Sequence, residues 1–189
     1  MILQRASIFF LLVLAIAFVS CDAKNPYDTG PAYDVEGNLK KDSLLIVDYL
    51  ETAQIDSLYR IYDPSGVVVI VQEEGTGSRP NSGNIIYTNY VGSLMSDGSV
   101  FDTNIEQVAR ENNMYDEKRD YSLLNFILVP VGQQGSVIQG WNIAYRRLRS
   151  GSKAKLIIPS TWAYRNNPPS NSIPDDAILV FDVEFRGMD

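Results

Sequence analysis

Histidine is absent from this chain of 189 residues, and Cys21 is its only cysteine. Without histidine, the chain holds neither a Ser-His-Asp nor a Cys-His nucleophile system. The usual zinc sites built from cysteine and histidine are excluded as well, and a single cysteine excludes a disulfide within the chain. Any reaction catalysed by this chain therefore needs little acid-base help from its side chains.

Positive charge is also scarce, because 16 Lys and Arg residues face 23 Asp and Glu residues, for a net charge of −7. An acidic chain repels the phosphate backbone, so the composition predicts no nucleic-acid partner. Aromatic residues make up 11% of the chain and include eleven tyrosines. This content of large apolar side chains excludes a disordered protein, and the length suits one domain of ordinary size with some extra sequence.

The first twenty residues have the pattern of a signal peptide. Arg5 precedes an apolar run over residues 8–19, and about 12 residues are too few for a membrane span but typical of a signal-peptide core. Cys21 follows directly after the small residue Ser20. This arrangement resembles a bacterial lipoprotein signal, in which the cysteine becomes the new N-terminus and carries acyl chains, although Phe18 stands where that pattern has a Leu-like residue.

We therefore expect residues 1–20 to be a signal peptide and Cys21 to be lipidated. The alternatives are an ordinary signal peptide before a free thiol and an uncleaved N-terminal helix. Several acyl chains on one cysteine make a stable anchor. The lipid form predicts a protein of the cell envelope, tethered to a bacterial membrane and facing either the periplasm or the outside.

Residues 21–62 are expected to form a lipidated tether and a short helix. Residues 22–41 are polar and lack a periodic apolar pattern, which predicts a tether. Residues 42–59 have the spacing of a short amphipathic helix or a pair of helices, with Asp42 as the N-cap. Such a helix either packs on the outside of the domain or docks a partner.

Residues 63–189 are predicted to form one domain of the α+β class. Short strands are expected at residues 67–71, 84–92, 154–158 and 178–186, with extended pieces at 100–102 and 123–131. Residues 103–122 form a charged excursion, helical over 105–114. The best helix covers 137–148, because Ile138, Trp141, Tyr145 and Leu148 build one apolar face. Antiparallel strands with one central helix and no βαβ rhythm define the α+β class.

Four blocks of this domain stand in a characteristic order. They are YVGSL followed by DGSVFD (90–94, 97–102), VIQGW (137–141), GSKAKLIIP through AY (151–164), and IP through LVFDVE (173–184). Over about residues 66–187 this order resembles the FKBP-type peptidyl-prolyl isomerases, the macrolide-binding immunophilins. The resemblance implies a bent antiparallel sheet wrapped over one helix, with an apolar pocket between them that accepts proline-containing polypeptides.

The same resemblance, transferred position by position, implies which residues form the pocket. They are Tyr90, Phe101, Asp102, Val137, Ile138, Trp141, Tyr164, Ile173 and Phe181. Trp141 would be the floor, and the Tyr164 hydroxyl and the backbone N–H of Ile138 would donate to substrate carbonyls. Asp102 would sit at the rim, or else serve as a turn carboxylate that accepts from backbone N–H groups. The resemblance implies no cofactor and no metal.

Three departures from the family pattern bear on this pocket. Arg165 stands where the family usually has glycine, and Ser172 where it often has an apolar residue. The segment before the helix is longer than usual, so either Phe126 or Ile127 fills the place of a pocket aromatic. The aromatics Tyr90, Trp141 and Phe181 also fit a plain hydrophobic core.

The sequence leaves two functions open. The first is a membrane-tethered prolyl isomerase that assists the folding of exported proteins. The second is a non-catalytic binding module with the same fold, such as an accessory subunit of a cell-envelope complex. In the second case, residues 42–59 or 103–122 would contact the envelope partner.

Overall fold

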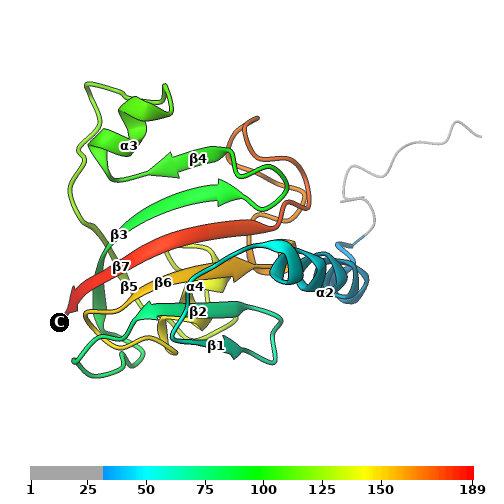
Figure 1. The fold of residues 1–189 in the computed structure, drawn as a ribbon, viewed down its shortest axis with the longest axis horizontal. Helices are drawn as coiled ribbons and strands as arrows, with labels where there is room; N and C mark the ends of the chain where they lie inside the picture. Colours follow the sequence, from blue (N-terminus) through cyan, green and yellow to red (C-terminus); the bar gives the residue numbers. More distant parts are fainter. Residues whose placement is uncertain (1–31) are drawn as a thin grey trace, which may run out of the picture. The chain divides into compact units, whose positions relative to one another are not determined.

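The computed structural model describes residues 32–189, of which Tyr33–Asp189 form one compact unit. Its centre is an antiparallel sheet in the order β1-β2-β6-β7-β3-β4, with β5 paired to β3 (Figure 1). The element bounds are α2 Val35–Thr52, β1 Tyr59–Tyr62, β2 Val68–Glu73, β3 Ile85–Leu94, β4 Val100–Thr103, α3 Glu106–Glu111, β5 Leu124–Ile127, α4 Gln139–Tyr145, β6 Lys153–Ile158, η1 Ser160–Trp162 and β7 Leu179–Met188. The expected signal peptide and Cys21 lie outside the described residues.

Both faces of the sheet are covered, because its central strands are apolar on both sides. Val67, Val69 and Val71 join one hydrophobic cluster with α4, whereas Val68 and Ile70 join a second cluster with α2. Successive side chains of a strand point to opposite faces. Helices α4 and α2 therefore pack on opposite faces of the sheet.

Helix α4 lies against the concave face, and it is shorter than the predicted helix over residues 137–148. Ile138 has an extended backbone, with φ −60° and ψ 150°, and acts as the N-cap. After Tyr145 the chain continues in turns, with hydrogen bonds from Arg147 N to Ala144 O and from Leu148 N to Tyr145 O. The Tyr145 hydroxyl, which is fully buried, donates to Thr88 Oγ1 at 2.7 Å and ties the helix to β3.

Helix α2 begins eight residues earlier than predicted, so the expected tether over residues 22–41 is wrong where it overlaps the helix. Asp34 is the N-cap, and its side chain accepts from Gly37 N at 2.9 Å. Asp42, the predicted N-cap, lies inside the helix and is 1% exposed. The helix ends at Thr52, and Tyr59, its predicted last residue, begins β1. Asp34 and Asp42 are both residue types that cap helices. Only the tertiary contacts of Asp42 show that it is not the cap.

The strand predictions largely hold, and the α+β class with an antiparallel sheet over one central helix is confirmed. On β3 the alternate residues Ile86, Thr88 and Tyr90 are buried, as the period of two predicts. The stretch 123–131 keeps only four residues as strand β5, and Pro130 follows it. In this strand Phe126 is 2% exposed and Ile127 is 54% exposed, so Phe126 is the core residue.

Within residues 32–189, no helix combines the length and the apolar character needed to cross a membrane.

Asp63 fixes the turn between β1 and β2 to the residues that follow α4. Its Oδ1 accepts from Ser65 N at 2.9 Å, and its Oδ2 accepts from the Arg147 guanidinium at 2.6 Å and 2.9 Å. Burial acts to raise the pKa of Asp63, but the bonds from Ser65 and Arg147 outweigh it, and the pKa lies below its ordinary value. The ionised carboxylate therefore stabilises the fold.

The Asp63→Asn variant should unfold at lower urea than the wild type at pH 7, with a free energy of unfolding about 1 kcal/mol smaller. Because the folded-state pKa is lowered, this stabilisation is present above about pH 4 and is lost as the pH falls through the folded-state value. The difference in free energy of unfolding between the wild type and Asp63→Asn, measured by urea unfolding, should therefore be smaller at pH 3 than at pH 7. Asp48→Asn, on the exposed side of α2, is the control, and a difference for Asp63→Asn that is as large at pH 3 as at pH 7 would contradict the assignment.

Candidate active site

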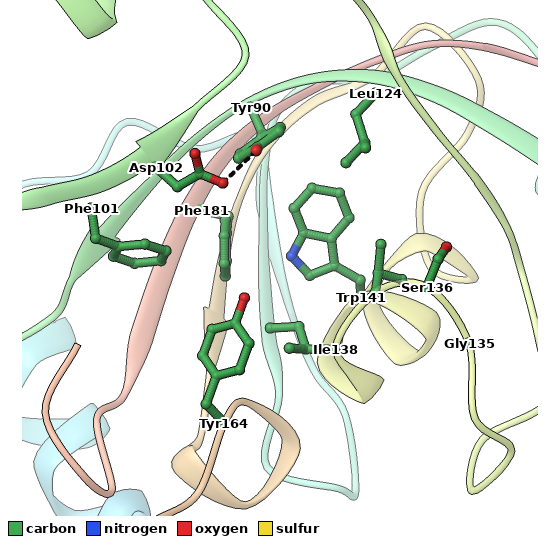
Figure 2. Close-up of a pocket in the computed structure, with 11 residues that line it drawn as sticks. Tyr90, Phe101, Asp102, Leu124, Gly135, Ser136, Ile138, Trp141, Tyr164 and Phe181 are labelled. Carbon is green, nitrogen blue, oxygen red and sulfur yellow. Dashed lines mark hydrogen bonds between the residues drawn. The ribbon is translucent and has the colours of Figure 1, made fainter. Parts of the chain in front are cut away.

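A cavity of about 360 Å³ opens between the concave face of the sheet, the start of α4 and the loop after β6. Figure 2 shows aromatic side chains from several of these elements around it. Its lining residues are Tyr90, Phe101, Asp102, Leu124, Gly135, Ser136, Val137, Ile138, Trp141, Tyr164 and Phe181. The volume suits one or two amino-acid side chains with their backbone.

The floor of the cavity is the indole of Trp141, which is 3% exposed. Tyr90 from β3 and Phe181 from β7 meet it edge-on, with ring centroids 5.4 Å and 5.2 Å away. Phe101 from β4 packs edge-on against Phe181 at 5.7 Å. Edge-to-face contacts are a favoured geometry for aromatic pairs, so these rings stabilise one another as the apolar walls of the cavity.

Gly92 on β3 leaves the space that two of these rings occupy. A Cβ at this position would lie 2.8 Å from ring atoms of both Phe101 and Phe181. The pairing of β3 with β4 also shifts register between Gly92 and Ser93. A side chain at Gly92 would therefore displace the outer wall of the cavity.

Asp102 at the rim accepts hydrogen bonds from its neighbours on both carboxylate oxygens. Its Oδ2 accepts from the Tyr90 hydroxyl at 2.6 Å (Figure 2), and its Oδ1 accepts from Arg119 Nη1 at 2.6 Å and from Thr103 N at 2.9 Å. Burial, and then the bond to Asp102, raise the pKa of the Tyr90 hydroxyl. The carboxylate therefore orients the Tyr90 ring and also accepts a backbone N–H, so it combines both roles expected of it.

Several hydrogen-bond donors at the cavity make no bond to another described residue, and the indole Nε1 of Trp141 in its floor is one of them. Two more lie at its edge. One is the hydroxyl of Tyr164, which points from the loop after η1 into the cavity (Figure 2). The other is the backbone N–H of Ile138, just before α4. Burial, and then the negative charge of Asp102, raise the pKa of Tyr164, so its hydroxyl stays protonated at neutral pH.

Eight of the nine predicted pocket residues line this one cavity. Ile173 does not, because its side chain is 3% exposed and packs into the main hydrophobic cluster. Arg165 replaces the family glycine and still adopts a glycine-like φ of 58°. Bonds from Arg165 Nε to Thr161 O and from Asp176 N to Arg165 O hold this bend. Ser172 is exposed and does not line the cavity.

Four residues at the cavity or its rim are not predicted from the sequence. Gly135, Ser136 and Leu124 line it, and the first two directly precede the recognised VIQGW block. Arg119 reaches Asp102 and also donates to the Tyr90 hydroxyl at 3.2 Å. Because Arg119 lies 17 residues from Asp102 within the excursion, no local pattern marks it.

The excursion over residues 103–122 is folded and contains an aromatic stack. The rings of Tyr115 and Tyr121 stack at 5.6 Å, and the Arg110 guanidinium lies 3.5 Å from the Tyr115 ring centroid. Of the predicted helix over 105–114, only Glu106–Glu111 is helical. Asn113 ends it in a left-handed conformation, with φ 57°.

Known proteins are similar to this chain in sequence and in fold. Peptidyl-prolyl cis-trans isomerase FKBP53 of Arabidopsis thaliana is 32% identical over 124 residues, which cover 65% of this chain and 22% of that protein. The FKBP-type isomerase FkpA of Aeromonas hydrophila is 31% identical over 125 residues, covering 66% of this chain and 39% of that protein. The chain thus spans well under half the length of these two relatives.

The crystal structure of FkpA from Escherichia coli superposes with a TM-score of 0.56 at 24% identity, covering all of this chain and 71% of that one, which shows a shared fold. A family model described as "FKBP-type peptidyl-prolyl cis-trans isomerase" matches residues 77–186, a stretch that includes every lining residue of the cavity. The chain therefore belongs to the family of FKBP-type peptidyl-prolyl cis-trans isomerases.

Proposed function

We propose that this chain is a peptidyl-prolyl cis-trans isomerase that acts on exported proteins from a lipid anchor at Cys21. The observation that carries the catalytic part is the cavity floored by Trp141, with the Tyr164 hydroxyl and the Ile138 N–H at its edge free to donate. The observation that carries the anchor is the sequence of residues 1–21 alone. Proline-containing polypeptides are the substrate class.

The reaction suits a site without an acid-base pair. Rotation about an X–Pro bond faces a barrier of about 20 kcal/mol, which arises from amide resonance. No covalent bond breaks, so no nucleophile and no metal is needed. The twisted amide at the barrier has less charge separation than the planar amide, so a dry aromatic cavity stabilises it relative to water.

The donors at the edge of the cavity hold the substrate backbone during this rotation. With the proline ring over Trp141, the Tyr164 hydroxyl and the Ile138 N–H each donate to a carbonyl that flanks the rotating bond. When both carbonyls are held, rotation is confined to the X–Pro bond. Holding the substrate in this geometry lowers the barrier by positioning. Asp102 contributes through Tyr90, because its Oδ2 accepts from the Tyr90 hydroxyl and orients that ring.

Isomerisation of a short peptide with an Ala-Pro bond, followed by exchange NMR, tests this function. The wild type should accelerate the exchange, and Tyr164→Phe should lower kcat/KM about tenfold, since one hydrogen bond in the transition state is lost. Tyr62→Phe is the matched control, because Tyr62 is 65% exposed on β1. A folded wild type that accelerates none of several X–Pro peptides would contradict the enzyme and favour the second candidate.

The second candidate is a non-catalytic binding module in a cell-envelope complex. The folded excursion favours it, because its Tyr115 and Tyr121 rings stack and Tyr115 is 37% exposed. Aromatic side chains of this kind are enriched at protein interfaces. In this case replacing Tyr115, and not Tyr164, would disable the protein in the cell.

The lipid anchor predicts that the chain, expressed in a bacterial host, incorporates an alkyne analogue of palmitate and sediments with membranes. Cys21→Ala should lose both the label and the membrane association, because Cys21 is the only cysteine of the chain. Ser20→Ala keeps a small residue before the cysteine and should retain both. A label of equal strength on Cys21→Ala, or an unlabelled wild type, would contradict the anchor.

A further inference from the structure

A carboxylate is buried in the face of α2 that packs on the rest of the domain. Asp42 is 1% exposed, and its Oδ2 accepts from Ser160 N at 2.8 Å and from Ser160 Oγ at 2.6 Å. Its Oδ1 is buried and has no hydrogen-bond partner among the described residues. A buried carboxylate with an unpaired oxygen lowers the stability of the fold. Stabilisation of α2 therefore does not explain why an aspartate stands at this position.

Tyr33, just before α2, makes a second contact with the segment between β6 and β7, which begins near Ser160. Its hydroxyl donates to Asp176 Oδ1 at 2.9 Å and lies 3.1 Å from Ser160 Oγ. The Arg165 guanidinium lies 5.3 Å from the centroid of the Tyr33 ring. Tyr33 therefore contacts the start, the bend and the end of the segment between β6 and β7.

This segment, residues 159–178, carries one wall of the cavity. Ser160 begins η1, and Tyr164 follows four residues later with its hydroxyl in the cavity (Figure 2). Arg165 N donates to Ser160 O at 3.2 Å, and Asp176 N donates to Arg165 O at 2.8 Å. Both Arg165 and Asp176 hold positive φ angles, 58° and 55°, which strain residues other than glycine and need support from their neighbours.

We propose that Asp42 and Tyr33 are positioning residues that hold this loop so that Tyr164 points into the cavity. The inference rests on the proposed function for its activity readout, and it assigns the N-terminal segment a part in substrate binding and turnover. Asp42 acts through Ser160, next to η1, and Tyr33 acts through Asp176 and Arg165. Small displacements of a group that holds the substrate lower catalysis steeply, which is why contacts remote from the proline ring matter.

The first test compares kcat/KM for an Ala-Pro peptide among full-length variants. Asp42→Ala removes the acceptor and should lower kcat/KM about tenfold, whereas Asp42→Asn keeps an oxygen acceptor and should recover part of the loss. Tyr33→Phe keeps the ring, loses the bond to Asp176 and should also lower kcat/KM. Asp48→Ala, on the exposed side of the same helix, is the matched control and should equal the wild type.

A double-mutant cycle with Tyr164→Phe separates positioning from loss of stability. If Asp42 acts through Tyr164, Asp42→Ala costs much less kcat/KM in the Tyr164→Phe background than in the wild type. Assays run well below the melting temperature of every variant keep unfolding out of the comparison. Equal losses in the two backgrounds, or wild-type kcat/KM in both Asp42→Ala and Tyr33→Phe, would overturn the proposal.

Amide hydrogen exchange provides a readout that does not require turnover. Asp42→Ala should speed exchange about tenfold or more over residues 161–177 and leave β3 and β7 protected, because only the loop is released. Asp42→Asn is the more conservative variant and should keep the fold. It should speed exchange of the same amides by a smaller factor. Unchanged loop exchange in Asp42→Ala overturns the positioning role, whereas a wild type without isomerase activity overturns the proposed function alone.

Discussion

The packing of aromatic rings around the indole of Trp141 is the interaction on which both the core and the cavity depend. Rings from β3, β5 and β7 all meet it, since Tyr90, Phe126 and Phe181 lie 5.2–5.5 Å from it between ring centroids. One side chain on the short helix α4 thus joins three strands and also floors the cavity. The same side chain therefore packs the core and shapes the site.

A sheet with apolar residues on both faces needs a second cover, and α2 provides it. The helix buries Ile46 against the outer face, in the cluster that includes Val68, Ile70 and Ile157. Covering that face brings the start of the helix to the loop that carries Tyr164. The outer layer of the domain and the wall of the cavity are thereby in direct contact through Asp42 and Ser160.

Much of this organisation can be predicted from the sequence, because strand periodicity and the four recognised blocks depend on local order. Tyr90, Trp141 and Phe181 fall where these blocks place them. The start of α2 and the role of Asp42 cannot be predicted in this way, because Asp34 and Asp42 are equally good caps and only Ser160, 118 residues away, distinguishes them. Arg119 is missed for the same reason, and Ile173 is misplaced because an apolar residue fits a cavity wall and a core equally well.

The central claim is that proline binds over Trp141, and the two tryptophans of the chain allow a direct measurement. Titration of the 15N-labelled protein with a short Ala-Pro peptide should shift the indole N–H resonance of Trp141, which lines the cavity. The resonance of Trp162 should stay in place, because its indole donates to Ser65 O at 2.8 Å and does not line the cavity. A Trp141 resonance unmoved at high peptide concentration, or a shift confined to Trp162, would contradict the account.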